Sequence, residues 1–253
     1  MKIVGVIQAR LTSSRLPGKT LLPIHGRPML LRCWDRLAFC ARLDSIVVAT
    51  SDDPANEPIR ALCAREGIGC VSAMTRDDQV AGRLLEAARA TSADAIVRIT
   101  PDCPLVDAGL VDLVVATGMG ERDFVAWTRN RLPSDYCSNV FPRTYPDGLD
   151  CEYITAETLA ALPEVEEPTR HIWEHPEGFR VTSVTHHDDL SALRWTVDRA
   201  DDLEFVRWVY ERLPEGFTWR DVLALDALGP WRERLMLLEP AVNPAHARLA
   251  RAR

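Results

Sequence analysis

Apolar positions in the first hundred residues follow two alternating patterns, which predict strands and helices in turn. Short apolar runs rich in β-branched residues are typical of buried strands and occur at residues 3–7, 45–50, 68–71 and 95–99. Apolar residues at helical spacing occur between these runs, at residues 30–41, 58–65 and 80–90. This alternation predicts a mostly parallel mixed sheet with helices on both faces, that is, a three-layer α/β fold.

Sheets of this kind bind their ligands beyond the carboxyl ends of the strands. The loops that follow Ile7, Thr50 and Ile99 all lie at that edge. We therefore expect the functional site to be built from these loops.

The second half of the chain is less regular. Between residues 128 and 150 the pattern is interrupted by Pro133, Pro142, Pro146 and Gly148. We expect an irregular excursion from the core there. Regular structure resumes at residues 182–184, with a strand at 193–197 and then a helix. One domain over residues 1–240 accounts for these elements, and the Ala- and Arg-rich residues 241–253 are predicted to form a flexible tail.

Composition narrows the class of protein. The chain has 253 residues, 47% of them hydrophobic, and a formal net charge of −7, which argues against a nucleic-acid partner. Only five apolar residues precede Gln8, too few for a signal peptide, and no run reaches the length of a membrane span. The seven cysteines form no Cys-x-x-Cys pair, which favours a reduced, cytoplasmic protein without disulfides.

The loop after the first strand carries the clearest chemical signal. Residues 8–19 read Gln-Ala-Arg-Leu-Thr-Ser-Ser-Arg-Leu-Pro-Gly-Lys, with three cations and three hydroxyls in twelve residues. A strand that ends in cations and free backbone amides is a place to hold a polyphosphate. The loop is not a P-loop, because Ser13 stands where that motif needs its first glycine and Pro17 stiffens the turn.

The same loop resembles the signature of sugar cytidylyltransferases, and four later blocks extend the resemblance. Among these enzymes are CMP-Kdo synthetases and acylneuraminate cytidylyltransferases, and the chain is most similar to SpsF-like proteins of spore-coat polysaccharide synthesis. The later blocks are residues 46–52, 97–105, 145–152 and 193–198. The resemblance implies a Rossmann-like nucleotidyltransferase fold, CTP as substrate, Mg²⁺ as cofactor and a small sugar-like acceptor.

Four residues are the predicted catalytic set: Arg10 and Lys19 for the triphosphate, and Asp102 and Asp198 as ligands of Mg²⁺. An arginine can hold two phosphate oxygens, a lysine acts as a point charge, and Mg²⁺ commonly takes one or two protein carboxylates. Asp198 has an alternative role as the N-cap of the following helix, because aspartate is favoured there. The resemblance, which matches both aspartates to metal-binding positions, favours the metal role.

Further residues are predicted to bind the nucleotide. The full set is Ala9, Arg10, Ser14, Arg15, Lys19, Asp77, Asp78, Gly82, Arg83 and Thr100. The resemblance places the 77–83 group near the base, although Asp77 and Asp78 also suit the start of a helix. Backbone groups alone can recognise cytosine, so the preference for CTP over another nucleotide rests on the resemblance.

The acceptor is predicted to meet Asp147, Gly148, Asp150 and Glu152. Residues 165–169 read Val-Glu-Glu-Pro-Thr, where the family commonly has Arg-Glu-His-Val-Thr. A cation and a histidine are thus missing and an acid is added. We therefore expect an acceptor less acidic than Kdo or sialic acid, unless Arg129, Arg131, Arg143 or Arg170 supplies the missing charge.

Two further hypotheses concern assembly and a rival chemistry. Aromatic residues in or beside the predicted excursion are typical of an interface core, and the resemblance implies a homodimer through it: Trp127, Tyr136, Phe141 and Tyr145. Residues 171–175 read His-Ile-Trp-Glu-His, an H-x-x-E-H zinc pattern, but Pro176 follows at once and no third ligand is evident.

The sequence thus predicts a Mg²⁺-dependent cytidylyltransferase that transfers CMP from CTP to a sugar or sugar-like acceptor and releases pyrophosphate. One alternative is a nucleotidyltransferase with another base or a phosphorylated acceptor. The other is a non-catalytic nucleotide-binding protein, which has little need of two metal-binding aspartates.

Overall fold

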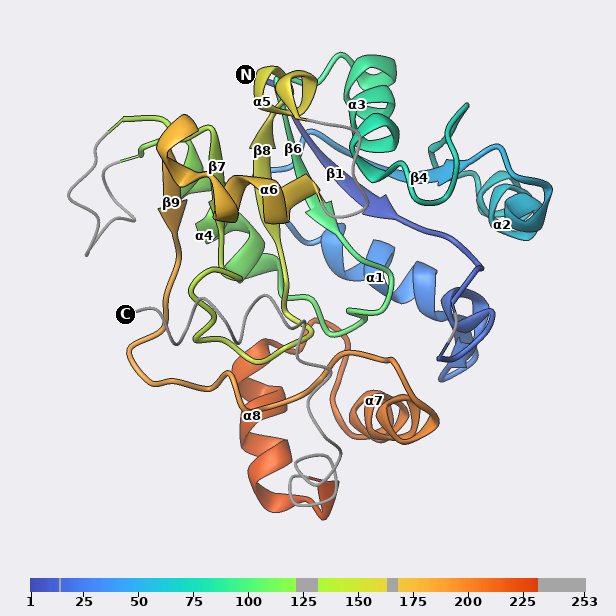
Figure 1. Ribbon diagram of the computed structural model, residues 1–253. Coiled ribbons are helices and arrows are strands. Elements are labelled where there is room, and N and C mark those ends of the chain that lie inside the picture. The colour runs from blue at the N-terminus through green and yellow to red at the C-terminus, as the bar shows by residue number, and fades with distance from the viewer. Residues whose placement is uncertain (14, 122–131, 163–167, 232–253) are drawn as a thin grey trace.

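A seven-stranded sheet organises the computed structural model, which describes residues 1–13, 15–121, 132–162 and 168–231. The strand order is β5-β4-β1-β6-β8-β7-β9 (Figure 1). The bounds are β1 Ile3–Gln8, β4 Ser45–Ser51, β5 Cys70–Ala73, β6 Ala95–Ile99, β7 Tyr136–Ser138, β8 Glu152–Thr155 and β9 Val181–Ser183. Strands β2 (Pro23–Ile24) and β3 (Arg27–Pro28) form a separate hairpin. The four strands expected in the first hundred residues are confirmed.

The direction of pairing places a topological switch point beside β1. Strand β1 runs parallel to both β4 and β6, and β5 extends this parallel part beyond β4. Strand β8 is antiparallel to β6 and to β7, and β9 runs parallel to β7. Because the chain leaves β1 towards β4 and returns on its other side at β6, the loops after β1 and β6 flank a topological switch point, where open α/β sheets bind ligands.

Helices cover both faces of the sheet, as the sequence predicts. They are α1 Met29–Leu37, α2 Glu57–Glu66, α3 Val80–Thr91, α4 Ala108–Gly118, α5 Ala156–Ala161, α6 Pro168–Glu174, α7 Ala200–Arg212 and α8 Trp219–Leu228. Short 3₁₀ turns lie at η1 Lys19–Leu21, η2 Pro54–Asn56 and η4 Pro176–Gly178. Ile3 and Ile7 of β1 belong to one hydrophobic cluster with residues of α1, α2, α4, α7 and α8, whereas Val4 and Val6 belong to a second one with residues of α3, α5 and α6. This alternation along one strand produces the three layers.

Residues 132–150 differ from the predicted excursion. Strand β7 lies inside the sheet between β8 and β9, and Tyr136 and Cys137 are fully buried there. Three residues among prolines are too few to show a strand pattern, and both partners of β7 lie later in the sequence. The expectation of an irregular excursion is therefore wrong for Tyr136–Ser138, whereas residues 139–150 carry turns and no further strand. Residues 128–131 lie outside the described part.

Residues 193–197 also differ from prediction, because they form no strand. A single parallel bridge joins Arg194 to Asp147. The backbone N–H of Trp195 donates to Asp147 O (2.6 Å) and that of Val197 to Asp102 O (2.8 Å). This segment thus pairs with two loops instead of a strand ladder. A smaller difference is that α1 ends at Leu37, short of Ala41.

Within the described residues, the sheet and the eight helices together extend to Leu228, and the single domain over residues 1–240 stays a prediction. The predicted tail, residues 241–253, lies outside the described residues. None of the helices in the described ranges combines the length and the apolar character that crossing a bilayer requires.

Candidate active site

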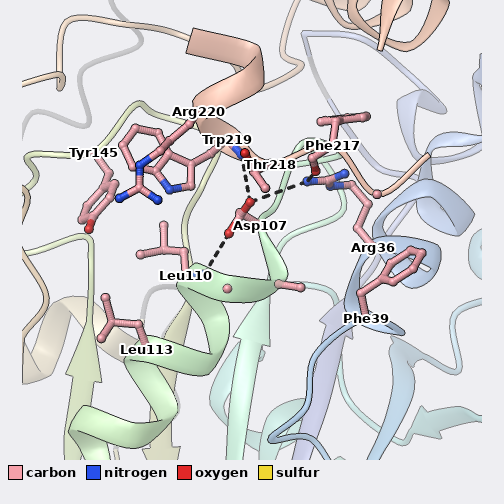
Figure 2. Close-up of a pocket in the computed structure, with 13 residues that line it drawn as sticks. Arg36, Phe39, Asp107, Leu110, Leu113, Tyr145, Phe217, Thr218, Trp219 and Arg220 are labelled. Atoms are coloured by element: carbon pink, nitrogen blue, oxygen red, sulfur yellow. Dashed lines mark hydrogen bonds and ion pairs between the residues drawn. The ribbon is translucent and has the colours of Figure 1, made fainter. Parts of the chain in front are cut away.

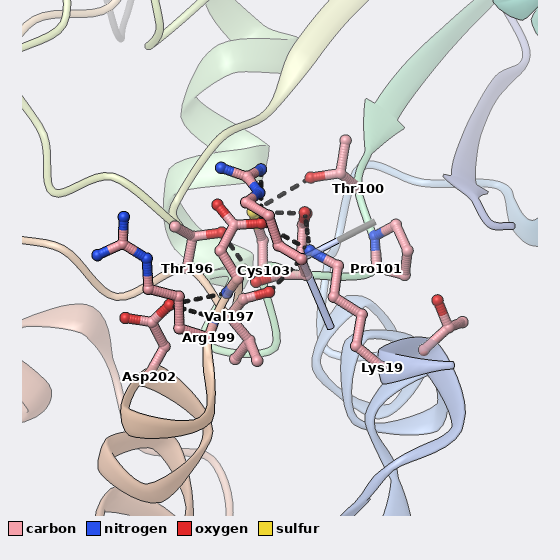
Figure 3. A network of polar contacts seen from close by, with 12 residues as sticks. Lys19, Thr100, Pro101, Cys103, Thr196, Val197, Arg199 and Asp202 are labelled. Carbon is pink, nitrogen blue, oxygen red and sulfur yellow. Dashed lines mark hydrogen bonds and ion pairs between the residues drawn. The ribbon is translucent and has the colours of Figure 1, made fainter. Parts of the chain in front are cut away.

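Lys19 lies at the centre of a cluster of acidic side chains. Its Nζ is 2.8 Å from Asp102 Oδ2, 2.8 Å from Asp198 Oδ1 and 2.8 Å from the Val197 carbonyl oxygen (Figure 3). These three acceptors satisfy all three N–H groups of the ammonium. Two carboxylates that share one nitrogen must lie close together, so the structure brings together Lys19, Asp102 and Asp198, three of the four predicted catalytic residues.

Mutual attraction within the cluster outweighs the effect of burial on the pKa values of Asp102 and Lys19. Burial would raise the pKa of Asp102, but the Lys19 ammonium outweighs this by charge and by hydrogen bonding, and the pKa lies below its ordinary value. Burial would likewise lower the pKa of Lys19, and Asp102 and Asp198 together raise it above its ordinary value. Lys19 and Asp102 are therefore expected to stay ionised around neutral pH.

Asp198 is held by cations and does not cap the following helix. Arg15 Nη2 lies 2.8 Å from Asp198 Oδ1 and is half exposed, so this predicted residue reaches the cluster from the solvent side. Helix α7 begins at Ala200, and the carboxylate that accepts from the backbone N–H groups of Asp198 and Arg199 is that of Asp202. The N-cap alternative for Asp198 is therefore wrong.

Long-range backbone contacts bring the two aspartates together. Asp102 lies in the turn after β6, at the switch point. Its carbonyl oxygen accepts from Val197 N (2.8 Å) and from Thr196 Oγ1 (3.2 Å), which docks the 193–198 segment on this turn. Thr100, in the same turn, places its Oγ1 3.2 Å from Cys103 Sγ.

Asp77 ties together three loops on the other side of β1. Its carboxylate accepts from Thr12 Oγ1 (2.6 Å), Ser51 Oγ (2.6 Å) and Asn56 Nδ2 (2.9 Å). Burial would raise the pKa of Asp77, but these hydrogen bonds outweigh it and the pKa lies below its ordinary value. Arg10 Nη1 lies 3.4 Å from the Asp77 carbonyl oxygen. Asp77 thus anchors the loop of Arg10 and is no helix-start charge.

Sequence reasoning missed Asn56, which is fully buried and forms hydrogen bonds both to the β1 loop and to Asp77. Its Oδ1 accepts from Leu11 N (2.9 Å), while its Nδ2 donates to Asp77 and to Ser51 Oγ (2.8 Å). Asn56 lies in η2, and no pattern in the sequence distinguishes it from other polar residues of a turn.

The remaining residues predicted to bind the nucleotide differ in their exposure to solvent. Arg83 is fully buried, and its Nη2 donates to the carbonyl oxygens of Arg76 (3.2 Å) and Asp77 (2.8 Å). Burial lowers the pKa of this guanidinium, and within the described residues its Nε and Nη1 have no hydrogen-bond partner. Arg83 therefore lies beneath the loops and not at their surface. Ala9 and Gly82 are buried, Asp78 is exposed and paired with Arg76 (3.0 Å), and Ser14 lies outside the described residues.

The predicted acceptor residues separate into two groups, the first built around Arg143. This guanidinium makes a bidentate pair with Asp150 (2.5 and 2.7 Å) and lies 3.5 Å from Asp147 Oδ1. Burial, and then the charge of Asp150, raises the pKa of Asp147 to about 6. Gly148 has φ +110°, and a Cβ there would lie 2.5 Å from Thr196 N, so only glycine fits.

Glu152 belongs to the second group, on the α6 side of the sheet. It pairs with Arg98 of β6 and accepts from Tyr136 Oη (2.6 Å). Arg98 also donates to Gln8 Oε1 (3.0 Å) and to Thr169 Oγ1 (3.3 Å). The signal that sequence reasoning passed over is the charge of Arg98 within an apolar strand.

The zinc pattern at residues 171–175 is not assembled as a metal site. Glu174 Oε1 accepts from Arg170 Nε (2.8 Å), and the His171 ring faces those of His175 and Phe179. Within the described ranges, the one group of three His, Cys, Asp or Glu side chains in metal-binding range is His186, His187 and Asp188, mostly exposed.

A cavity of about 280 Å³ lies apart from the aspartate cluster, between the starts of α4 and α8 (Figure 2). Asp107 at its edge accepts from Leu110 N (2.9 Å) and Trp219 N (2.8 Å), so it caps α4 and joins it to α8. None of the predicted site residues lines this cavity.

Comparison with known proteins identifies the family. A model of the cytidylyltransferase family matches residues 4–134, just over half of the chain. The chain belongs to the cytidylyltransferase family. The match to this family includes the β1 loop, the Asp77 loop and Asp102, and it ends before Asp147 and Asp198.

Relatives in this family match different shares of the chain. A 3-deoxy-manno-octulosonate cytidylyltransferase of Solibacter usitatus is 35% identical over 136 residues, 53% of this chain and 52% of that protein. An uncharacterised protein of Methanocaldococcus jannaschii is 35% identical over 182 residues, 72% of this chain and 71% of that one. The chain therefore spans about half the length of the octulosonate enzymes that it matches.

Solved structures agree with the family fold. A cytidylyltransferase from Leptospira borgpetersenii superposes with a TM-score of 0.80 at 26% identity, covering 92% of this chain and 96% of that one. A CMP:2-keto-3-deoxy-manno-octonic acid synthetase complexed with CTP gives 0.58 at 22% identity, covering 84% and 99%. The predicted nucleotidyltransferase fold is thereby confirmed.

Proposed function

We propose that this protein transfers CMP from CTP to a sugar or sugar-like acceptor and releases pyrophosphate, with Mg²⁺ as cofactor. The observation that carries the proposal is the convergence of Asp102 and Asp198 on Lys19, beside the cationic β1 loop of a cytidylyltransferase-family chain. Two ionised carboxylates facing one point are costly unless a cation lies between them. A phosphate-binding loop next to that point suits nucleotidyl transfer.

The donor set around Lys19 fits Mg²⁺. Two carboxylates and the Val197 carbonyl offer hard oxygen atoms, which this ion prefers. When bound, Mg²⁺ supplies positive charge that neutralises the phosphate oxygens and the leaving pyrophosphate. Lys19 holds the two carboxylates together in this structure, and its flexible side chain can exchange carboxylate contacts for phosphate contacts.

Arginines of the β1 loop supply the remaining cations for the triphosphate. Arg15 is half exposed at the solvent side of Asp198, and Arg10 is anchored on the Asp77 loop. A guanidinium binds two phosphate oxygens with fixed geometry, so these residues orient the α-phosphorus towards the acceptor. Asp77 and Asn56 act indirectly by fixing the loop.

The acceptor side is acidic, which supports a hydroxyl-rich or amine-bearing acceptor over a sugar acid. Asp147 and Asp150 face Arg143, whose guanidinium is already paired with them. Arg170 pairs with Glu174, and Arg129 and Arg131 lie outside the described residues. Unbalanced carboxylates repel an acidic acceptor by about 1 kcal/mol per close pair in water.

Pyrophosphate release from CTP and Mg²⁺ tests the proposal, with neutral sugars, amino sugars and sugar acids as separate acceptor classes. We expect turnover with a neutral or amine-bearing acceptor and little with Kdo or N-acetylneuraminate. Lys19→Ala serves as the inactive control. Efficient turnover of either acid would overturn the acceptor class while leaving the CMP transfer intact.

Nucleotide choice is tested by thermal shift with each of the four nucleoside triphosphates, with and without Mg²⁺. A ligand at 100 to 1,000 times its Kd stabilises the protein by about 2.7–4.1 kcal/mol. CTP should give the largest shift. A larger shift with another base would favour the alternative nucleotidyltransferase, and binding without turnover would favour the non-catalytic protein.

The homodimer stays a prediction with less support than the sequence suggested. Tyr136 and Tyr145 are buried within the chain itself, so these aromatic residues cannot form the interface core. Phe141 stacks on Trp173, and Trp127 lies outside the described residues. Light scattering at micromolar concentration decides between one copy and two.

A further inference from the structure

Arg194 and Asp202 form a buried ion pair directly behind Asp198. The Arg194 guanidinium donates to Asp202 through Nε (3.2 Å to Oδ1) and Nη2 (2.9 Å to Oδ2). Arg194 is 6% exposed and Asp202 is 1% exposed, so both groups are almost completely buried. A pair this deep in the protein is held in one geometry, unlike an ion pair at the surface.

Asp202 also fixes the main chain at Asp198. Its Oδ2 accepts hydrogen bonds from the backbone nitrogens of Asp198 and Arg199, each at 2.8 Å. Because Asp202 lies in the first turn of α7, these bonds tie Asp198 to the start of a thirteen-residue helix. The direction in which the Asp198 side chain leaves the backbone is thereby set by α7.

The same guanidinium reaches the Asp198 side chain. Arg194 Nη2 lies 3.4 Å from Asp198 Oδ2, whereas Lys19 Nζ contacts Oδ1 at 2.8 Å. One oxygen of the carboxylate therefore faces the protein interior and the other faces the site. In Figure 3, Asp202 and Lys19 lie on opposite sides of this network.

The Arg194–Asp202 ion pair is not arranged to give the greatest stability. Within the described residues, Arg194 Nη1 is buried without a hydrogen-bond partner, and an unsatisfied buried donor costs stability. Replacing such an ion pair by apolar residues is often neutral or favourable for stability. Orientation of the Asp198 carboxylate therefore accounts for the geometry of the pair better than a contribution to folding stability does.

We propose that Arg194 and Asp202 are positioning residues that hold the Asp198 carboxylate with Oδ1 aimed at Asp102 and a divalent cation. The inference deepens the proposed function and rests on its assignment of Asp198. Groups that orient metal-binding side chains typically change metal affinity by about 10–100-fold when mutated. Neither residue needs to touch nucleotide or acceptor.

Mn²⁺ binding without nucleotide, followed by the electron paramagnetic resonance of free Mn²⁺, is the direct test. Arg194→Lys keeps the positive charge and removes the fork that spans Asp202 and Asp198. We expect its Mn²⁺ affinity to fall at least about tenfold and its half-saturating Mg²⁺ concentration in turnover to rise in parallel. The KM for CTP at saturating Mg²⁺ should change little.

Arg36→Lys is the matched control. Arg36 is also buried, at 7% exposure, and donates to the carbonyl oxygens of Val106 (2.5 Å) and Phe217 (3.0 Å). Its Nη2 also lies 3.9 Å from Asp107 Oδ2, and Asp107 is neither of the two proposed metal ligands. This variant should lose stability and keep its Mn²⁺ affinity. An equal loss of Mn²⁺ affinity in the control would overturn the positioning role, because general destabilisation would then account for both.

Asp202→Asn is a second test variant, which keeps the side-chain shape and removes the charge. It tests the positioning role if Arg194→Lys does not fold. We expect weaker Mn²⁺ binding there too, since the amide no longer pairs with Arg194. Wild-type affinity in these variants would overturn this inference alone. Wild-type protein that binds no Mn²⁺, with or without CTP, would overturn the proposed metal chemistry together with it.

Discussion

Asp102 and Asp147 lie on neighbouring sides of the same site, yet their pKa values shift in opposite directions. Their side chains are similarly exposed, 26% and 31%, and burial is the first cause acting on both. Asp102 has Lys19 at 2.8 Å, and its pKa is lowered. For Asp147 burial and the charge of Asp150 outweigh the opposing charges of Arg143, at 3.5 Å, and Arg194, and its pKa is raised to about 6.

The comparison shows that the cation beside each aspartate, more than burial, decides whether the carboxylate is ionised. One side of the site is thereby kept charged, as a metal site requires. The other side holds an aspartate that changes its charge near neutral pH.

The largest expected effect comes from removing the charge of Asp102 or Asp198, the carboxylates of the proposed metal site. Asp102→Asn and Asp198→Asn keep the side-chain shape but cannot hold a divalent cation beside the phosphates. We expect pyrophosphate release at saturating Mg²⁺ to fall by at least about a hundredfold. Asp35→Asn, which removes the partner of Arg27 away from the site, is the control. Near-normal turnover in either site variant would remove that residue from the proposed metal site.

Lys19→Met should make Asp102 behave like Asp147. Removing one partner of a buried ion pair costs about 3–5 kcal/mol, and partial exposure of Asp102 reduces this to about 2–3 kcal/mol at pH 7. In wild type the pKa of Asp102 is lowered, so its contribution to stability persists until pH falls below the ordinary aspartate pKa of 3.8. In the variant, burial without a cation is expected to raise this pKa, so the folded variant takes up a proton and regains stability as pH falls from 7. Urea unfolding should therefore show a gap to wild type that narrows from pH 7 to pH 4.5.

Added Mg²⁺ sharpens this test. In Lys19→Met the two carboxylates face one point without an internal cation, so Mg²⁺ should recover part of the lost stability. Wild-type protein should respond less, because Lys19 already neutralises the pair. A variant that Mg²⁺ does not stabilise would count against a metal site at this point.

Asp147→Asn should have the smallest effect and the opposite sign. A raised carboxyl pKa means that the folded state binds more protons than the unfolded state between about pH 4 and pH 6, so stability falls as pH rises through this window. The neutral variant should gain about 1–2 kcal/mol at pH 7.5 and little at pH 4. Urea titrations at both pH values measure this, with exposed Glu215→Gln as the control. Equal effects at both pH values would contradict the raised pKa.

The sequence by itself determined the parts of this protein that local patterns encode. Apolar runs of a few residues, separated by amphipathic helices, specified the four parallel strands and therefore the edge at which the site lies. The cationic loop and the two aspartates each stand in short motifs with recognisable chemistry. Such features can be predicted from the sequence because hydrophobic periodicity and loop composition involve only residues that are close together in the chain.

Only the tertiary structure decided how these residues combine. The position of Lys19 between Asp102 and Asp198 depends on residues 193–198 docking on the β6 turn. The role of Asp77 as an anchor depends on hydrogen bonds from Thr12 in the β1 loop and from Ser51 and Asn56 between β4 and α2. Strand β7 and the pairing of Glu152 with Arg98 likewise arise from strand partners elsewhere in the chain. Hydrogen bonds between distant segments produce no periodic pattern in the sequence. The pKa of a buried carboxylate therefore depends on neighbours that only the tertiary structure brings to it.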